Sequence, residues 1–452
     1  MTATLHANLD RAADFTAGIG TRTLPPEVID AAKKCLADWI GVAIGARDEP
    51  AGRSVRATVR RWRAQGIAPV LFGEPTAPVG AALANGTLAH CLDFDDTHVG
   101  SVAHLSAPSW AAVLAAGSTG AASEVALLNA FVAAFEVGAQ LGGQGFGGTV
   151  NHSGWHSTGV FGTLAAAAGA AAATRLDREA AGRALGIAAT QAGGLTGSFG
   201  TMSKPFHAGK AAFNGVLSAE MASDGFVPAL DLLEPDGALA RALVQDRRQR
   251  LPDVDFDAGW QLLANTFKPY ACCLLAHATI DAGRTLRAAS VGRPIASVTA
   301  FVNPMAIKLA ARPAPATALE GKFSTQYCAA LALSGFKATQ TDFSPERIAD
   351  PALRALTAKV RLQEDEAMSE TASRMVIDYA DGTRAEAVTA LARGNPGNPL
   401  NWDDLAEKFM PLAEPKLGAR TATELLACLR EFERPGALAT VWRLCNGKVS
   451  PR

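Results

Sequence analysis

The stretch GVFGTLAAAAGAAAAT, residues 159–174, is the most apolar run of the chain and points to a fold of closely packed helices. It consists mostly of alanine and glycine, whose small side chains let neighbouring helices approach closely in a soluble core. The run is short for a membrane span, which needs about 20 apolar residues. We therefore expect a buried helix over residues 158–173 and no interaction with a membrane.

Helical patterns continue on both sides of this run. After Pro25-Pro26, apolar residues recur at helical spacing from Val28 to Trp39. Glycine or proline stands at most junctions between such patterns. Further helices are predicted over residues 81–91, 109–116, 125–138, 180–189 and 208–222. No strand-like alternation precedes residue 297.

The pattern changes after residue 297, where strands are expected. Residues 297–302 (SVTAFV) and 359–362 (KVRL) are typical of strands. Residues 374–379 and 384–389 flank Asp381-Gly382, a two-residue hairpin signal. Helices are predicted at 325–332 and from Trp402 onward. We therefore predict a mainly α fold, in which residues 1–267 and 397–452 form a large all-helical domain and residues 268–396 form a smaller inserted α+β lid domain.

Composition narrows the class of protein. The chain has 452 residues, of which 48% are hydrophobic, and a formal net charge of −1. It can bury a large core, and its charge gives no general reason to expect nucleic acid or an anionic membrane as partner. The seven cysteines are odd in number and show no CxxC spacing. The N-terminus lacks the pattern of a secretory signal, so we expect a cytoplasmic protein with reduced thiols.

Seven of the eight histidines fall between residues 90 and 277. They lie in four short segments that also hold aspartates and lysines: residues 90–109, 151–163, 197–217 and 267–282. Histidine titrates near neutral pH and can carry protons both ways. Neighbouring carboxylates and lysines shift its pKa or hold a charged substrate. We therefore expect the four segments to share one pocket.

The first segment places Asp93, Asp95 and Asp96 within four residues. Mutual repulsion is expected to raise the pKa of at least one of them unless they are neutralised. The alternative is a solvated acidic turn that caps a helix. His98 and His104 follow closely and favour a functional segment.

The second and third segments lie at predicted helix starts. His156 precedes the helix of residues 158–173, whose free amides favour an anion. Lys204 and Lys210 lie near the start of the helix at 208–222, where positive charge opposes the helix dipole, so a bound anion would relieve this cost. The alternatives are capping or core histidines at 152 and 156, and lysines that point to water.

The fourth segment holds Lys268, Tyr270 and His277, where the chain leaves the predicted helical domain. Binding sites often lie at domain junctions. The alternative for His277 is a histidine with satisfied hydrogen bonds on an otherwise apolar helix.

Two further patterns are set aside. Gly143, Gly145 and Gly148 match GxGxxG, but they follow a helix and no βαβ unit surrounds them. The histidines lack HExxH or other zinc spacing. We expect neither a dinucleotide cofactor nor a metal.

Together the motifs resemble the MmgE/PrpD family. The resemblance rests on DFDDTH, GWHSTG, KPFHAGKAAFNGVL, FKPYACC and KFSTQY, and it covers nearly the whole chain. It implies a helical domain with an α+β lid, often in a homodimer. Members of this family include 2-methylcitrate dehydratase, cis-aconitate decarboxylase and iminodisuccinate epimerase. The resemblance therefore implies a small polycarboxylate as substrate and no metal or organic cofactor.

The resemblance also implies a set of site residues and their roles. Lys204 would hold substrate carboxylates, and His104 and His156 would orient the substrate or carry protons. His277 would be general acid or base, Asp93 would set the state of a neighbouring histidine, and Thr97 would donate a hydrogen bond to the substrate. Other predicted substrate-binding residues are His98, Lys210, Lys268 and Tyr327.

Three departures leave the reaction open. His98 stands where the decarboxylases and dehydratases usually have Trp, Asp95 stands where the dehydratases usually have Asn, and residues 199–205 (FGTMSKP) look closer to the epimerase. We expect an acid–base lyase without a cofactor that acts on a di- or tricarboxylic acid. The alternatives are an epimerase of a dicarboxylate and a non-catalytic dicarboxylate-binding protein.

Overall fold

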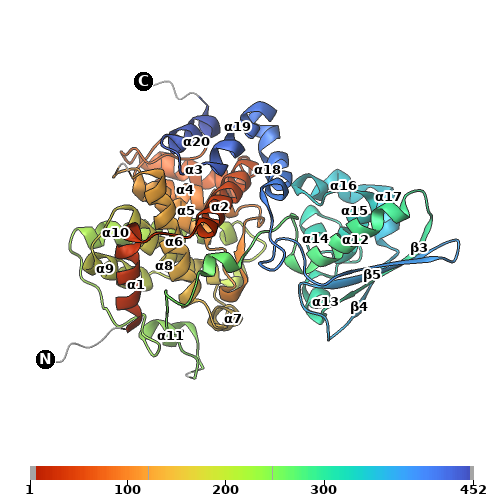
Figure 1. The fold of residues 1–452 in the computed structure, drawn as a ribbon, viewed down its shortest axis with the longest axis horizontal. Helices are drawn as coiled ribbons and strands as arrows, with labels where there is room; N and C mark the ends of the chain where they lie inside the picture. The colour runs from red at the N-terminus through yellow and green to blue at the C-terminus, as the bar shows by residue number, and fades with distance from the viewer. Residues whose placement is uncertain (1–6, 121, 247, 448–452) are drawn as a thin grey trace. The chain divides into compact units, whose positions relative to one another are not determined.

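A computed structural model of the protein describes residues 7–120, 122–246 and 248–447. The chain forms two compact units. The first comprises residues 1–266 and 412–452, and the second residues 267–411. Helices dominate, which confirms the predicted mainly α class (Figure 1).

The first unit is built almost entirely of helices. Strands β1 (Thr97–His98) and β2 (Asn265–Thr266) pair antiparallel within it. Sequence analysis predicted no strand before residue 297, because two residues are too few to show alternation. The helices are α1 (Ala7–Gly18), α2 (Pro26–Gly45), α3 (Pro50–Trp62), α4 (Pro78–His90), α5 (Ser106–Gly117), α6 (Glu124–Leu141), α7 (Phe146–His152), α8 (Ser157–Ala173), α9 (Arg178–Ala189), α10 (Ser203–Ser223), α11 (Ala238–Leu243), α19 (Ala419–Arg430) and α20 (Ala437–Asn446).

Small residues bring the central helices close together. Helix α10 packs against α4 and α8. A Cβ atom on Gly209 would lie 2.1 Å from Oγ1 of Thr87 in α4, and one on Gly215 would lie 2.4 Å from Cβ of Ala166 in α8. The predicted core helix is α8, and nearly all of its residues are buried. The alanine and glycine content therefore fixes the close approach of the helices that carry the candidate site.

Helix α6 is also notable for its hydropathy. It is the one helix in the described ranges that is long and apolar enough to cross a membrane, and most of it is buried inside the first unit. Burial of this kind is typical of a core helix. Sequence analysis singled out residues 159–174 as the most apolar run, and that helix is shorter.

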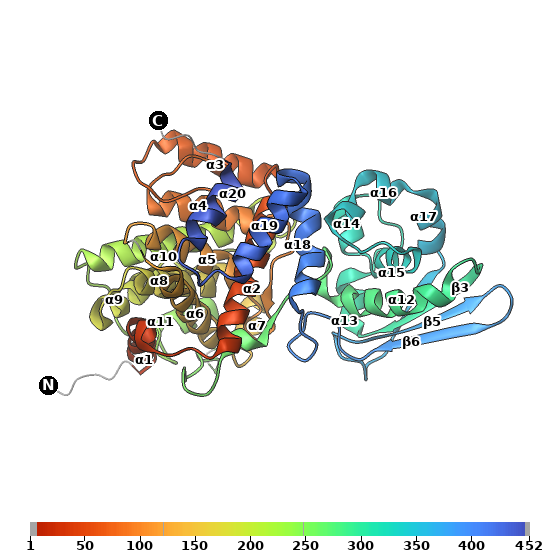
Figure 2. The same ribbon diagram turned by 45° about the horizontal axis from the view of Figure 1, so that its top comes forward.

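The second unit contains a four-stranded sheet of order β4-β3-β5-β6. Strand β3 pairs parallel with β4 and antiparallel with β5, which forms a hairpin with β6. Helices α12 and α15 cover one face (Figure 2). The strands are β3 (Ile295–Val302), β4 (Val360–Glu364), β5 (Ser373–Tyr379) and β6 (Arg384–Thr389), and the helices are α12 (His277–Ser290), α13 (Pro304–Ala310), α14 (Ala318–Lys322), α15 (Thr325–Ser334), α16 (Pro345–Ala349) and α17 (Pro351–Thr357).

The core of the second unit follows the predicted strand pattern. Val298, Met375 and Ile377 point from the sheet toward Ala282 of α12 and Ala329 of α15, and all five are buried. Helix α18 (Trp402–Leu417) begins in this unit and ends in the first.

Candidate active site

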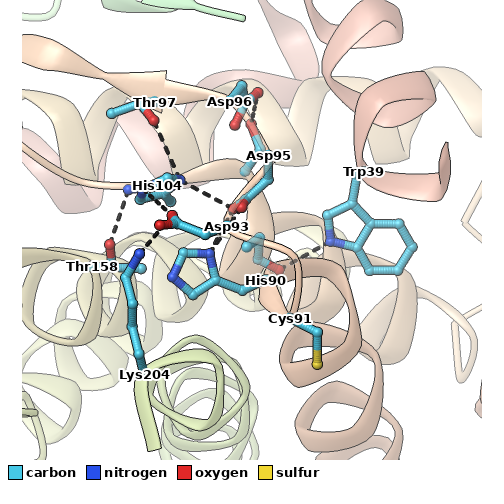
Figure 3. A network of polar contacts seen from close by, with 12 residues as sticks. Trp39, His90, Cys91, Asp93, Asp95, Asp96, Thr97, His104, Thr158 and Lys204 are labelled. Carbon is cyan, nitrogen blue, oxygen red and sulfur yellow. Dashed lines mark hydrogen bonds and ion pairs between the residues drawn. The ribbon is translucent and has the colours of Figure 1, made fainter. Parts of the chain in front are cut away.

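A cluster of ionisable side chains lies in the first unit, around the loop that follows α4. Nζ of Lys204 lies 2.6 Å from Oδ1 of Asp93. The same carboxylate oxygen lies 3.6 Å from Nε2 of His104. Figure 3 shows the Asp93 carboxylate between the His104 ring and the Lys204 ammonium. Three predicted residues from two of the four segments are therefore in contact.

A buried histidine and aspartate adjoin this ion pair. Nδ1 of His90 lies 2.9 Å from both carboxylate oxygens of Asp95, and both side chains are almost fully buried. Burial alone would raise the pKa of Asp95, but the neighbouring rings of His90 and His104 outweigh it and hold this pKa well below its usual range. Asp95 is therefore a carboxylate near neutral pH, and Nδ1 of His90 donates to it.

The second nitrogen of His90 is left available for chemistry. Nε2 is buried and has no hydrogen-bond partner among residues 7–120, 122–246 and 248–447. With Nδ1 facing Asp95, a proton that the ring exchanges with a substrate is exchanged through Nε2. Such an arrangement suits a proton acceptor whose orientation is fixed.

His104 bridges two carboxylates. Its Nδ1 lies 3.3 Å from Oδ2 of Asp95 and 3.3 Å from Oγ1 of Thr97, while Nε2 faces Asp93. Its backbone N–H donates to Oγ1 of Thr158 at 3.0 Å, which ties the loop to the first turn of α8. Two adjacent carboxylates stabilise a positive charge on the ring, so His104 suits the role of a proton donor.

His156 completes the cluster as the N-cap residue of α8. Its ring stacks on that of His90 with centroids 5.9 Å apart, and its Nδ1 lies 3.1 Å from Nδ1 of His207. Burial and the nearby rings and ammonium of His90 and Lys204 hold the pKa of His156 far below its usual range. His156 is therefore neutral, and Phe199 covers its ring at 4.9 Å.

The backbone around Asp93 explains how the loop turns inward. α4 ends at His90, and Asp93 has a left-handed φ of +52°. A non-glycine residue in this region is uncommon, although Asp is among the residues that tolerate it best. The strand pair that follows sets Thr97 opposite Thr266 and fixes the exit of the loop.

Asp96 holds the same loop in place through buried hydrogen bonds. Its Oδ2 accepts hydrogen bonds from Ser106 at 2.6 Å and from Nδ2 of Asn265 at 2.8 Å, and its backbone N–H donates to Asp38. Burial, together with the Asp38 carboxyl, raises the pKa of Asp96 to about 7. One of the three neighbouring aspartates therefore has a raised pKa, but burial and Asp38 are the main causes rather than the expected repulsion among the three. The alternative of a solvated acidic turn is wrong, because Asp95 and Asp96 are 1% and 0% exposed.

Two predicted residues of the first unit have other contacts. Nδ1 of His98 lies 2.9 Å from Oγ of Ser101, and its ring packs on Phe135. Lys210 donates to Oδ1 of Asn214, one turn along α10, and lies over the ring of Phe213. The predicted substrate contacts of both residues stay a prediction.

Three predicted residues belong to the second unit. Nε2 of His277 lies 3.2 Å from the carbonyl of Cys272, and its ring meets that of Tyr270 at 5.2 Å. The hydroxyl of Tyr327 donates to the carbonyl of Asp342 at 2.8 Å, and Lys268 is buried. Their place in a site shared with Asp93 stays a prediction.

His90 and Asp95 are site residues that the sequence did not predict. Their side chains meet because His90 is the last residue of α4 and the loop folds back beneath it, a turn that spacing alone does not reveal. The available signal was the number of ionisable residues between His90 and Thr97.

The same residues have the chemistry of metal ligands. Ligand atoms of His90, Asp95 and His104 all lie within 4.8 Å of one another. Imidazole and carboxylate are ligands that a divalent transition metal accepts. Sequence analysis predicted no metal, and removal of metal from the protein tests that prediction.

Comparison with known families agrees with the motifs. Residues 10–251 match the MmgE/PrpD N-terminal domain, and residues 270–431 match the MmgE/PrpD C-terminal domain. The chain belongs to the MmgE/PrpD family. The resemblance inferred from the motifs is confirmed.

Three curated proteins illustrate the similarity. A cis-aconitate decarboxylase-like protein oryM of Aspergillus oryzae is 24% identical over 457 residues, which cover 94% of each chain. The cis-aconitate decarboxylase of Homo sapiens is 24% identical over 96% of this chain and 93% of its own length. That of Aspergillus terreus is 29% identical over 60% of this chain and 59% of its own.

Proposed function

We propose that this protein is a lyase that acts on a small di- or tricarboxylic acid by acid–base chemistry, without a cofactor. The observation that carries the proposal is the contact of Lys204 with Asp93 inside a cluster of three histidines. The names of the curated relatives make decarboxylation of cis-aconitate the first reaction to test. Dehydration of a 2-methylcitrate-like acid needs the same residue types and is the second.

Lys204 supplies the positive charge that a carboxylate substrate needs. An ammonium has three donors, and Asp93 occupies one of them in this structure. The remaining donors are available for substrate oxygens. The start of α8 lies beside His156 and adds backbone amides that favour an anion.

The histidines supply a proton donor and two acceptors. His104 lies between two carboxylates and suits the protonated form, whereas His156 is neutral and His90 presents an Nε2 without a hydrogen-bond partner among the described residues. Groups in opposite protonation states a few ångströms apart allow a proton to be removed from one position and delivered to another. His277 remains our proposed further acid or base.

Decarboxylation needs one bond broken and one proton delivered. The bond between a carboxylate carbon and its neighbouring carbon breaks, CO2 leaves, and the electron pair stays on the substrate. A proton from the imidazolium of His104 then joins the substrate carbon, and the neutral ring regains a proton from solvent. Fixed positive charge beside the carbon lowers the free energy of the developing carbanion.

A panel of four acids in D2O tests the proposal. The protein is incubated with cis-aconitate, 2-methylcitrate, citrate and iminodisuccinate, and the products are followed by NMR. Release of CO2 with deuterium incorporation identifies a decarboxylase, and loss of water identifies a dehydratase. Exchange without net loss identifies the epimerase alternative. Binding of an acid without any of these changes contradicts the proposal and favours the non-catalytic alternative.

A further inference from the structure

Two adjoining hollows lie in the first unit, formed by residues that take no part in the cluster around Asp93. Their volumes are about 430 Å³ and 730 Å³. They share Arg60, Phe72, Gly73 and Glu74 in their linings, so they form one continuous surface. We call this surface the arginine groove, after the arginines at positions 47, 53, 56, 60 and 63.

Helix α3 places most of these arginines in a row. Arg53, Arg56 and Arg60 are three and four residues apart and therefore lie on one face of the helix. Arg63, the C-cap residue, continues the row. With a rise of about 1.5 Å per residue, the row extends over roughly 15 Å. The backbone positions of these arginines thus follow the helix axis in a row.

The positive charge of the groove is compensated only in part, by Asp48, which acts on Arg47 and Arg53 without a direct ion pair. The structure shows no carboxylate within ion-pair distance of these five arginines among the residues it describes. Lys416 and Arg443, which also line it, are paired with Asp48 and Glu424. Glu74 is the acidic residue of the described lining. A chain with a net charge of −1 therefore concentrates cations here.

Arg56 is held in place and still lacks a partner for one nitrogen. Its Nη2 donates to the carbonyl of Arg47 at 2.6 Å. Its Nη1 is buried and has no hydrogen-bond partner among the described residues. A Cβ atom on buried Gly52 would lie 3.4 Å from this Nη1, so the nitrogen is enclosed beside the helix. The exposed guanidinium groups of Arg53 and Arg60 are the ones that an anion in the groove would reach.

An aromatic ring fixes the two arginines at the junction of the hollows. The guanidinium carbons of Arg47 and Arg56 lie 5.0 Å and 6.0 Å from the centroid of Phe72. Phe72 has a left-handed φ of +58°, and its N–H donates to Oδ1 of Asn446 at 2.8 Å. This backbone conformation is strained for a bulky residue. Such strain, held by surrounding contacts, is often found at ligand sites.

We propose that the arginine groove is a binding site for a linear polyphosphate group, such as that of a nucleoside di- or triphosphate. A line of planar guanidinium groups matches successive phosphates along a chain and allows bidentate hydrogen bonds to each. A compact tricarboxylate would reach only part of the row. The proposal does not depend on the reaction catalysed at the other site.

Isothermal titration calorimetry of the full-length protein tests the site at 150 mM salt, where long-range attraction between exposed charges is screened. The probes are inorganic tripolyphosphate, ATP and citrate. The test variants are Arg60→Gln and the double variant Arg56→Gln/Arg60→Gln. Arg61→Gln is the matched control, because Arg61 is on the same helix, loses the same charge and does not line the groove. Circular dichroism verifies that each variant is folded.

We expect tripolyphosphate and ATP to bind the wild-type protein and citrate to bind at least tenfold more weakly. Arg60→Gln should weaken tripolyphosphate binding about tenfold, which corresponds to the loss of one charge-assisted contact, and Arg61→Gln should leave it unchanged. Equal affinities for ATP and tripolyphosphate would show that the phosphate chain suffices, and tighter binding of ATP would add a nucleoside contact. Absence of binding, equal weakening in Arg61→Gln, or citrate binding as tight as tripolyphosphate would overturn the proposal.

Discussion

Nδ1 of His90 lies 2.9 Å from the buried carboxylate of Asp95, and its Nε2 faces the cluster without a hydrogen-bond partner in the described part of the chain. The pair links the end of α4 to the loop that carries Asp93. It gives the candidate site a histidine whose tautomer is set by a neighbouring charge.

The role of this pair is tested by a double-mutant cycle. His90→Gln and Asp95→Asn should each lower kcat by about 10²–10⁴, the usual range for loss of general acid–base catalysis. Because Asp95 acts through His90, the double variant should be no slower than the worse single variant. Steady-state kinetics with the acid identified by NMR provide the measurement. Losses that multiply in the double variant would show that the two residues act independently.

Lys204 and Lys210 form a matched pair on one helix. Lys204→Met should lower kcat/KM by about 10²–10³, because it removes the charge that stabilises the substrate anion and its transition state. Lys210→Met should retain most activity, since Lys210 contacts Asn214 and Phe213 instead. Equal losses of kcat/KM in the two variants would indicate that both lysines contact the substrate, as the sequence predicts for Lys210.

Removal of metal separates acid–base chemistry from metal chemistry at His90, Asp95 and His104. We expect unchanged kcat after extended dialysis against a chelator, with metal content measured by mass spectrometry. Restoration of lost activity by Zn²⁺ or another divalent ion would instead show that these three residues bind a required metal.

His98 affects stability through its protonation. Burial lowers its pKa to about 4, from an ordinary value of 6.5. The unfolded chain therefore binds a proton at pH 4–6.5 that the folded chain does not, so the wild-type protein loses stability as pH falls through this range. His98→Asn removes this effect. Relative to the variant, the wild type should lose about 3 kcal/mol of unfolding free energy between pH 7 and pH 4. Parallel pH profiles in urea denaturation would contradict the assignment.

The contact between α4 and α10 is tested at Gly209. Its substitution by Ala places a Cβ 2.1 Å from Oγ1 of Thr87 and 2.4 Å from the carbonyl of Leu83, so the helices must separate. We expect a loss of about 1–3 kcal/mol of stability and lower activity, because α4 carries His90 and α10 carries Lys204. Gly182→Ala is the control, since its Cβ would meet only Ala13 at 3.6 Å. Equal thermal unfolding temperatures for the two variants would show that α4 and α10 can separate at Gly209 at little cost in stability.

The motifs predicted much of the cluster but not its buried pair, His90 and Asp95. Asp93, Thr97, His104, His156 and Lys204 are predicted from the sequence, because they stand in motifs that resemble the MmgE/PrpD family. His90 and Asp95 were missed as a pair, since their contact depends on a loop that reverses after α4. The arginines of α3 show helical spacing in the sequence, but only the fold reveals that Phe72 packs against two of the groove arginines.

The strand predictions show the same limit. Residues 297–302, 359–362, 374–379 and 384–389 correspond to β3 to β6 with small differences at the ends. β1 and β2 were missed, because each is only two residues long. β3 was predicted although its partners β4 and β5 lie far along the chain, since its own eight residues show the strand pattern.

The first unit is made of two segments separated in sequence by the second unit, which affects how it folds during synthesis on the ribosome. Helix α19 packs on α2, and Asn446 accepts the hydrogen bond that holds Phe72. These partners emerge only after the entire second unit has been synthesised. We therefore expect the nascent first unit to stay incomplete while residues 267–411 are translated, with the α2 surface that α19 covers still exposed. Chaperones should bind the chain most readily in that interval.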